Sequence, residues 1–288
     1  MKILGIGNAI VDVLCKVEDK FIQKNSLTKS TMKLVDEKEF NSLLSNLNIS
    51  QTVAGGSVAN SIVGLSQLGN NVGFIGKVSD DELGGKYEEG LKKEKVKFFY
   101  SKKKEKIPTG TCLILITPDS ERTMVTFLGT AGKINEDDID ENAIKKSEIL
   151  FLEGYLWDEG EPKKAFDKAI KYANKVAMSL SDLFCVERHK ANFLDLVKNK
   201  LDITFANEQE IMSLINTSMA SIPNPPKVIM VTADPERDSP EVLKEYLLAF
   251  NETFQGLSGS LKNLNVLAGQ LGFTFRKIPG PVLGTYSI

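Results

Sequence analysis

Short apolar runs and amphipathic segments alternate along most of the chain. From Met1 to about Asn216, β-rich apolar runs are followed by segments whose apolar positions recur at helical spacing. The predicted strands are Lys2–Ile10, Val72–Ile75, Thr111–Thr117, Arg122–Leu128, Ile149–Leu152, Lys175–Ser179 and Ile203–Ala206. The predicted helices are Glu37–Leu47, Val58–Leu68, Gly84–Glu94, Glu136–Lys146, Lys163–Asn174, Glu187–Lys198 and Glu208–Asn216. This alternation predicts an α/β fold with a mostly parallel sheet and helices on both faces.

Two segments interrupt this alternation. Val13–Val35 and Val96–Thr117 contain polar, alternating runs in place of a simple strand and helix. We expect their strands to form a small β-lid that projects from the main sheet.

The character of the chain changes near residue 217. Seven of the ten prolines lie in the last 72 residues, and residues 217–226 have the small, polar and proline-rich composition of a linker. The elements predicted after the linker form a βαβαβ unit: strand Lys227–Thr232, helix Pro240–Phe250, strand Gln255–Leu257, helix Ser260–Leu271 and strand Gly272–Lys277. We therefore predict two structured parts, residues 1–216 and 227–288.

Composition narrows the possible chemistry. The 36 basic and 38 acidic residues leave a net charge of -2, which favours neither nucleic acid nor a membrane surface as a partner. No run approaches the ~18 apolar residues of a membrane span, and no signal peptide is recognised, so we expect a cytoplasmic protein. Three widely separated cysteines and a single histidine, His189, argue against zinc sites and against Ser-His or Cys-His triads. The chemistry is then left to carboxylates and backbone amides.

The most informative segment is AGGSVAN, residues 54–60. Gly55 and Gly56 permit positive φ and a close approach of a ligand to the backbone. Asn60 lies four residues after Gly56, on the same side of a helix, and its amide both donates and accepts hydrogen bonds. This arrangement suits a pair of sugar hydroxyls, although a turn that only packs the strand against the helix explains the spacing equally well.

Two acidic residues follow apolar strands. Asp12 and Glu153 are expected where a parallel sheet ends and ligands usually bind. With Gly55, Gly56 and Asn60, Asp12 would form a hydroxyl-binding set. The alternatives are a turn or cap aspartate and a glutamate at the start of a helix.

A third position with chemical potential is FANEQE, at the start of the helix predicted from Glu208. Asn207 and Glu210 have the spacing of a capping box, which is the strong structural alternative. The functional hypothesis is a phosphate and magnesium anchor, with Glu210 holding Mg²⁺ through water and Asn207 positioning phosphate oxygens. Asp182 could line the same crevice, although a purely structural role is favoured for it.

These segments resemble one family. GIGNAIVD, AGGSVAN, FIGKVSDDELG, SERTMVTFLGTAG, FLEGYLWD, LSDLFCV and FANEQE resemble, in order and spacing, the ribokinase/PfkB-type carbohydrate kinases and their adenosine-kinase-like branch. The resemblance covers Met1 to about Asn216. It implies a ribokinase-like fold with a β-lid, and transfer of phosphate from ATP, with Mg²⁺, to a nucleoside or sugar hydroxyl.

The resemblance also implies residue roles. Asp12, Gly56, Ser57 and Asn60 would hold the ribose hydroxyls, with Gly55 beside them, and Glu153 would line the sugar pocket. The remaining element, Asn207 with Glu210, would bind magnesium and phosphate.

One family signature has no counterpart in the sequence. The family's C-terminal Gly-Ala-Gly-Asp supplies backbone amides to the transferring phosphoryl group and an aspartate to the attacking hydroxyl, and no such segment occurs in the 288 residues. We therefore expect a core that lacks this catalytic part, with impaired kinase activity. The alternative is a non-catalytic module that binds a nucleoside or sugar.

The tail has its own resemblance. DPERDSPE and its surroundings, about Lys227–Pro279, resemble the middle of the Sco/SenC copper chaperones, whose fold is thioredoxin-like. Those proteins bind copper through cysteines and a histidine, and this tail contains neither. We expect a thioredoxin-like fragment without copper. A metallochaperone-like protein is the least favoured hypothesis.

Overall fold

The chain folds into two compact units. The computed structural model describes residues 1–101, 103–158, 161–215, 228–248, 252–270, 274–275, 277–279 and 286–287. The first unit is Met1–Glu210 and the second is Ile211–Ile288.

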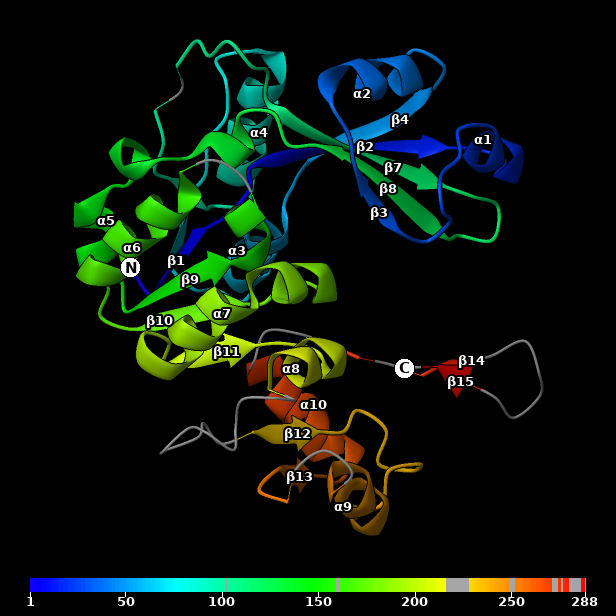
Figure 1. Ribbon diagram of the computed structural model, residues 1–288, viewed down its shortest axis with the longest axis vertical. Helices are drawn as coiled ribbons and strands as arrows, with labels where there is room; N and C mark the ends of the chain where they lie inside the picture. The colour runs from blue at the N-terminus through cyan, green and yellow to red at the C-terminus, as the bar shows by residue number, and fades with distance from the viewer. Residues whose placement is uncertain are drawn as a thin grey trace. The chain divides into compact units, whose positions relative to one another are not determined.

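A six-stranded parallel sheet forms the body of the first unit (Figure 1). Its order is β11-β10-β9-β1-β5-β6, and every neighbouring pair is parallel. The strands are β1 (Ile3–Ile6), β5 (Val72–Ile75), β6 (Lys97–Phe98), β9 (Ile149–Glu153), β10 (Val176–Ser179) and β11 (Ile203–Phe205). The α/β fold predicted from the sequence is confirmed.

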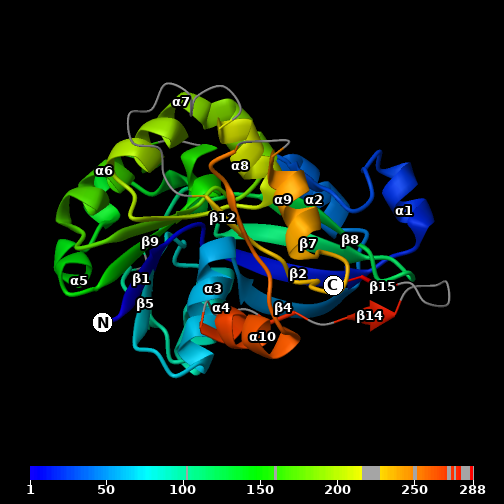
Figure 2. The ribbon, with the colours of Figure 1, turned by 90° about the horizontal axis from the view of Figure 1, so that it is seen from below.

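Helices cover both faces of the body sheet. In Figure 2, α3 and α4 lie on one side of the sheet, and α6 and α7 lie on the other. The helices of the body are α3 (Ser57–Gln67), α4 (Glu82–Lys93), α5 (Glu141–Lys145), α6 (Pro162–Tyr172) and α7 (Leu183–Asn199). The boundary between the two units falls within α8 (Glu208–Ile215). The 3₁₀ turns are η1 (Ala131–Lys133), η2 (Glu136–Asp138) and η3 (Gly154–Asp158). The single helix predicted over Glu136–Lys146 is divided because the side chain of Asp140 accepts from Ala143 N and starts α5.

A second, five-stranded sheet forms the lid, which projects from the body (Figure 1). Its order is β3-β8-β7-β2-β4. The strands are β2 (Ile10–Lys16), β3 (Met32–Leu34), β4 (Ile49–Gly55), β7 (Gly110–Ile116) and β8 (Arg122–Phe127). Two short helices, α1 (Asp19–Lys24) and α2 (Glu37–Leu44), belong to the same region.

The lid is larger than the sequence pattern suggests. The segments expected to build it supply β2, β3 and β7, but β4 was not predicted and β8 was placed with the body strands. Val96–Thr117 was also wrong in part, because its first strand, β6, pairs with β5 in the body sheet. A helix, α1, stands within the segment expected to contain only strands. Single-strand periodicity does not show which sheet a strand joins, because that depends on its partners.

The first predicted strand is also divided. Lys2–Ile10 was expected to be one strand, whereas β1 ends at Ile6 and β2 begins at Ile10 in the other sheet. Gly7 lies in the break, where an added Cβ would stand 2.4 Å from Oε2 of Glu153. A side chain at this position would therefore displace Glu153, and this close approach explains the glycine.

The second unit contains the alternating elements predicted for the tail. Its strands β12 (Ile229–Val231) and β13 (Gln255–Leu257) are parallel, with α9 (Pro240–Leu248) between them and α10 (Leu261–Gln270) after them. A short antiparallel pair, β14 (Ile278–Pro279) and β15 (Tyr286–Ser287), follows. The strand predicted at Gly272–Lys277 is not found at residues 274–275 and 277, and its other residues, like the linker at 217–226, lie outside the described residues. The thioredoxin-like resemblance stays a prediction.

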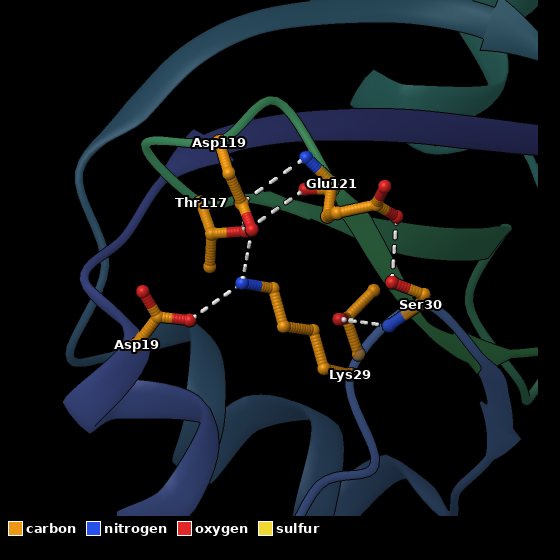
Figure 3. A network of polar contacts seen from close by, with 7 residues as sticks. Asp19, Lys29, Ser30, Thr117, Asp119 and Glu121 are labelled. Carbon is orange, nitrogen blue, oxygen red and sulfur yellow. Dashed lines mark hydrogen bonds and ion pairs between the residues drawn. The ribbon is translucent and has the colours of Figure 1, made fainter. Parts of the chain in front are cut away.

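A polar network ties together the far end of the lid (Figure 3). Nζ of Lys29 lies 2.7 Å from Oδ1 of Asp19 and 2.6 Å from Oδ2 of Asp119. On the β7–β8 turn, the Thr117 hydroxyl donates to Asp119 Oδ1 at 2.6 Å. The Ser30 hydroxyl donates to Glu121 Oε2 at 2.6 Å. The segment from Asp19 to Ser30 is thereby joined to the β7–β8 turn, about 90 residues away in the sequence.

Within the part of the chain that the structure describes, none of the helices has both the length and the apolar character required to cross a bilayer.

Candidate functional site

The topology of the body sheet defines where a ligand would bind. The chain runs from β1 through the lid to β5 on one side of β1, and later returns to β9 on the other side. The carboxyl ends of β1 and β9 therefore diverge, which is the usual position of a ligand crevice in an open α/β sheet. Asn8 follows the end of β1, and Glu153 is the last residue of β9.

A cavity of about 250 Å³ lies at this point, between the body and the lid. The body contributes polar groups and a helix start: Asn8, Gly56, Ser57, Asn60, Glu153 and Tyr155. The lid contributes mainly apolar side chains: Ile10, Met32, Leu34, Cys112, Ile114, Met124 and Leu128, together with Asp12 and Thr126. The cavity thus has one polar and one largely apolar wall.

Strand register explains the composition of the lid wall. Cross-strand partners place Asp12 opposite Cys112, Cys112 opposite Thr126, and Thr126 opposite Leu34. Two residues further along the strands, Ile114 pairs with Met124 and Met124 pairs with Met32. Because side chains alternate between the two faces of a strand, these residues share the face toward the cavity. The opposite face carries the buried core residues Val11, Val13, Leu113, Leu115 and Val125.

The turn into α3 requires glycine at residue 56. Gly56 has φ 102° and precedes the first residue of the helix. An added Cβ would stand 2.3 Å from the backbone oxygen of Asn8, which cannot move away as a flexible side chain would. Glycine therefore allows the start of α3 to contact the end of β1 and the cavity.

Glu153 is held by the protein rather than left open to the cavity. Its side chain is 1 % exposed. Oε1 accepts from Nδ2 of Asn8 at 2.8 Å and from the backbone N of Asn8 at 3.2 Å. Oε2 accepts from the backbone N of Val58, in the first turn of α3, at 3.0 Å. Burial raises the pKa of Glu153, and these hydrogen bonds oppose the increase.

Asn8 completes this cluster and was not predicted as a site residue. It is 4 % exposed and lines the cavity. Its Nδ2 donates to Glu153, while its Oδ1 is buried and has no hydrogen-bond partner among the described residues. A buried acceptor without a partner costs free energy unless a ligand or water satisfies it. Because this feature depends on side-chain orientation, no spacing in the sequence could have shown it.

Asp12 does not lie at a strand end, as the sequence suggested, but inside β2 of the lid. Its carboxylate faces the cavity and covers Gly55, where an added Cβ would stand 2.2 Å from Oδ2. Among the residues that the structure describes, none shares a hydrogen bond or ion pair with Asp12. Burial raises its pKa to about 6. The group is thus a carboxylate acceptor near neutral pH with its hydrogen-bonding capacity unused by the described chain.

The structure brings most of the predicted hydroxyl-binding set together. Asp12, Gly56, Ser57, Asn60 and Glu153 all line the cavity. Gly55 lies behind Asp12, and its backbone oxygen accepts from the Tyr87 hydroxyl at 3.2 Å. The sequence reading missed Asn8, Tyr155 and the apolar lid residues.

Cys112 lies in the lid wall as an unreactive thiol. It is 5 % exposed, and the Thr126 hydroxyl donates to its Sγ at 3.2 Å. Burial raises the pKa of Cys112 to about 12, so the thiolate is not formed at neutral pH. We therefore regard Cys112 as part of the wall and not as a nucleophile.

Asn207 and Glu210 form the reciprocal capping box and do not line the cavity. Asn207 Oδ1 accepts from Glu210 N at 2.9 Å, and Glu210 Oε2 accepts from Asn207 N at 3.1 Å. Burial raises the pKa of Glu210 above its ordinary value. The hydrogen bond from Asn207 N lowers the pKa by a smaller amount, and the nearby charge of Asp182 raises it further. Asp182 is itself the N-cap of α7, accepting from Cys185 N at 2.8 Å.

The described residues contain no group of three or more histidine, cysteine or acidic side chains placed to hold a metal ion.

A mostly parallel sheet and a separate β-lid that meet at a cavity define an α/β protein with a candidate ligand site at the switch point of its body sheet. The model of the pfkB family of carbohydrate kinases matches residues 28–253. The chain belongs to this family. The matched region extends beyond residue 216, where the sequence reading ended the resemblance.

Known proteins similar to the chain act on nucleosides and sugar derivatives, by their names. Guanosine-inosine kinase of Escherichia coli K12 is 26% identical over 231 residues, covering 75% of this chain and 53% of the relative. A 5-dehydro-2-deoxygluconokinase of Clostridium perfringens is 36% identical over 124 residues, covering 42% of this chain and 37% of the relative. The crystal structure of adenosine kinase from Sinorhizobium meliloti is 34% identical with a TM-score of 0.70, covering 75% of this chain and 68% of that one. The chain thus spans about half the length of the first curated relative.

Proposed function

We propose that this chain binds a ribonucleoside in the cavity between body and lid and acts as an adenosine-kinase-like phosphotransferase with reduced turnover. The observation that carries the proposal is the division of one cavity into a polar wall and an apolar wall. A nucleoside has a ribose that suits the polar wall and a flat base that suits the apolar wall. A plain sugar would leave the apolar wall without contacts.

The polar wall suits the ribose. Asp12 accepts hydrogen bonds from adjacent hydroxyls, and Asn60 donates and accepts from the α3 side of the cavity. Gly55, Gly56 and Ser57 allow the sugar to approach the backbone. Glu153 holds the cavity floor in place through its bonds to Asn8 and Val58.

The apolar wall suits the base. Met32, Leu34 and Met124 are partly exposed lid residues that face the cavity. Their removal from water by a flat aromatic base would contribute about 25 cal/mol for each Å² of apolar surface buried. Thioether groups also make favourable contacts with aromatic rings.

Magnesium and ATP are the cofactors that membership of this family implies. We propose that Asn207 and Glu210 contribute to holding the nucleotide phosphates and Mg²⁺, with Glu210 acting through water. The nearby carboxylates Asp182 and Glu210 supply the negative charge that a divalent cation requires. Magnesium, when bound, would neutralise charge that develops on the phosphates.

Turnover should be low in these 288 residues. They contain no Gly-Ala-Gly-Asp segment, which in the family supplies amides and an aspartate for phosphoryl transfer. A missing general base alone costs roughly 10²–10⁴ in rate. The same observation favours a second function, in which the chain binds a nucleoside without transferring phosphate.

One pair of measurements tests both functions. Adenosine, guanosine, inosine and ribose are each titrated calorimetrically with the purified chain, and ADP formation is measured with ATP, Mg²⁺ and each compound. We expect nucleosides to bind more tightly than ribose and ADP to form slowly or not at all. Preferential binding of ribose would contradict the nucleoside proposal, and rapid ADP formation would contradict reduced turnover.

A further inference from the structure

The two short connections between the body sheet and the lid sheet meet at one point. One is Gly7–Ala9 and the other is the single residue Gly56. They touch, because a Cβ added to Gly56 would stand 2.3 Å from the backbone oxygen of Asn8. Beside them, the Tyr87 hydroxyl of α4 donates to the Gly55 backbone oxygen at 3.2 Å. Attachment at this point alone would leave the lid free to rotate about it.

Two longer connections also join the lid to the body. Residues 99–109 lead from β6 to β7, and residues 128–148 lead from β8 to β9. Thr130 N donates to the Pro108 backbone oxygen at 3.0 Å, so the two connections lie side by side near the lid. A flexible connection restrains its ends only weakly, because the entropy of loop closure changes slowly with length. The contacts that hold these connections to the body therefore decide how freely the lid can turn.

Lys77, which follows β5 in the body, contacts both long connections. Its Nζ lies 3.3 Å from Oε1 of Glu105, in the first connection, and 3.1 Å from Oδ2 of Asp138, in the second. Nζ of Lys103, in the first connection, lies 3.5 Å from Oδ1 of the same aspartate. Lys77 is 6 % exposed and Asp138 is 7 % exposed. A buried charge that loses its partner is destabilising, so burial favours the state in which these ion pairs are formed.

The second connection is ordered where Lys77 contacts it. Oδ2 of Asp138 also accepts from the backbone N of Asn135 at 3.1 Å. Oδ1 of Asn135 accepts from the backbone N of Asp137 at 2.9 Å, which completes the capping box of η2. The ion pair therefore acts on the backbone of the connection and not on a loose side chain.

We propose that Lys77 is a positioning residue that acts through Glu105 and Asp138, attaching the lid to the body at a second place and so narrowing the range of angles between the two sheets. The two attachments together prevent a rotation that either one alone would permit. This inference goes beyond the proposed function, because it concerns the ligand-free protein and does not depend on what the cavity binds.

A distance between the lid and the body measures this range. Lys38, on α2 in the lid, and Asn192, on α7 in the body, are exposed and are each replaced by a spin-labelled cysteine. The three native cysteines are buried, so the labels attach to the introduced thiols. Pulsed electron paramagnetic resonance of the ligand-free chain gives the distribution of distances between the labels. Lys77→Met should broaden this distribution, and an unchanged distribution would overturn the proposal.

A second variant distinguishes orientation from stability. In Lys77→Met, the buried Asp138 carboxylate keeps only the exposed Lys103 as an ion-pair partner among the described residues, which should lower the thermal stability. Adding Asp138→Asn removes the buried charge and should restore most of this stability, while the distance distribution stays broad. A narrow distribution in the double variant would show that Lys77 contributes stability alone, against the proposal. The double variant also decides the case in which Lys77→Met does not fold.

The matched control is Lys29→Met. Like Lys77, Lys29 contacts two carboxylates, those of Asp19 and Asp119 (Figure 3). Both of these partners belong to the lid, so Lys29→Met should leave the distance distribution unchanged. Equal broadening in Lys29→Met and Lys77→Met would indicate a general loosening of the lid and would contradict the assigned role.

Amide hydrogen exchange locates the effect along the chain. Lys77→Met should speed exchange at residues 103–109 and 131–138, where the two connections are released, and leave exchange in β1 unchanged. A uniform increase that includes β1 would indicate loss of global stability instead of release of the connections, and would likewise overturn the proposal.

Discussion

Folding favours the protonated form of the Asp12 carboxyl group, whereas ligand binding favours the ionised form. Its pKa is raised to about 6 because burial removes its carboxylate from water. The folded state therefore binds the Asp12 proton more tightly than the unfolded chain does. The stability that Asp12 contributes is complete at low pH and is lost as the pH rises from about 4 to 6.

Replacing Asp12 by asparagine should therefore stabilise the protein at neutral pH. The shift of about two pKa units corresponds to a gain in unfolding free energy of up to about 3 kcal/mol above pH 6. The gain should shrink toward zero below pH 4, where both forms are neutral. Urea unfolding of Asp12→Asn and the unaltered chain at several pH values measures it. A difference that does not change with pH would contradict burial as the cause.

The same residue should make ligand binding depend on pH. The affinity for adenosine should rise with pH through the pKa of about 6, since the ionised carboxylate is the better acceptor. Asp12→Asn should bind more weakly and with a flatter pH profile. Stability gained and binding lost in one variant would identify Asp12 as a site residue kept at a cost to folding.

At the scale of the strand, the pairing register gives the lid sheet one face toward the cavity and one face toward the buried core. Met32 and Met124 are cross-strand partners on the cavity face. The double variant Met32→Ala, Met124→Ala should weaken adenosine binding and leave ribose binding unchanged, because only the base is proposed to contact this wall. Calorimetric titration of both ligands measures the difference. Equal losses for the two ligands would show a general effect on the cavity.

The far end of the lid provides an electrostatic prediction. Hydrogen bonds from Lys29 and Thr117 lower the pKa of Asp119 to about 2. The contribution of Asp119 to stability is therefore present above pH 4 and lost as the pH falls toward 2. Lys29→Gln should speed amide hydrogen exchange in the β7–β8 turn at pH 7, with a smaller change in 1 M salt, because salt screens exposed charges. A salt-independent change would point to packing of the lysine stem instead.

The limits of sequence reading are clearest among these elements. Apolar runs such as Val72–Ile75 and Ile149–Leu152 identified body strands because buried parallel strands are continuously apolar. β4, ISQTVAG, was missed because its residues are mostly exposed or half-buried and its pattern is weak. Gly56 and Asn60 were predicted from local spacing and Glu153 from its place after an apolar strand, and all three line the cavity. Met32, Ile114 and Leu128, in contrast, meet only through pairing of distant strands. The Asn8 amide depends on a bond to a residue 145 positions away.

For the whole molecule, the division into two compact units predicts how the chain unfolds. The single tryptophan, Trp157, lies in the first unit, where its ring packs edge-on against Phe166 at 5.4 Å and Phe193 at 5.8 Å. Its fluorescence therefore reports the unfolding of that unit alone. Calorimetric heating, in contrast, detects both units.

We expect adenosine to separate the two transitions. Ligand at a concentration 100 times its Kd should stabilise the unit that binds it by about 2.7 kcal/mol. The transition followed by Trp157 should move to higher temperature, and a transition belonging to Ile211–Ile288 should not move. One transition that shifts as a whole with ligand would show that the two units unfold cooperatively.

The two sheets of the first unit share no strand, and the chain passes between them at Gly7–Ala9, at Gly56, between β6 and β7, and between β8 and β9. Asp12 belongs to the lid sheet, while Asn8, Asn60 and Glu153 belong to the body. A ligand that contacts both groups of residues would link the lid sheet to the body sheet. The length of the ligand would then set the angle between the two sheets. Complexes with ligands of different length would therefore differ measurably in this angle.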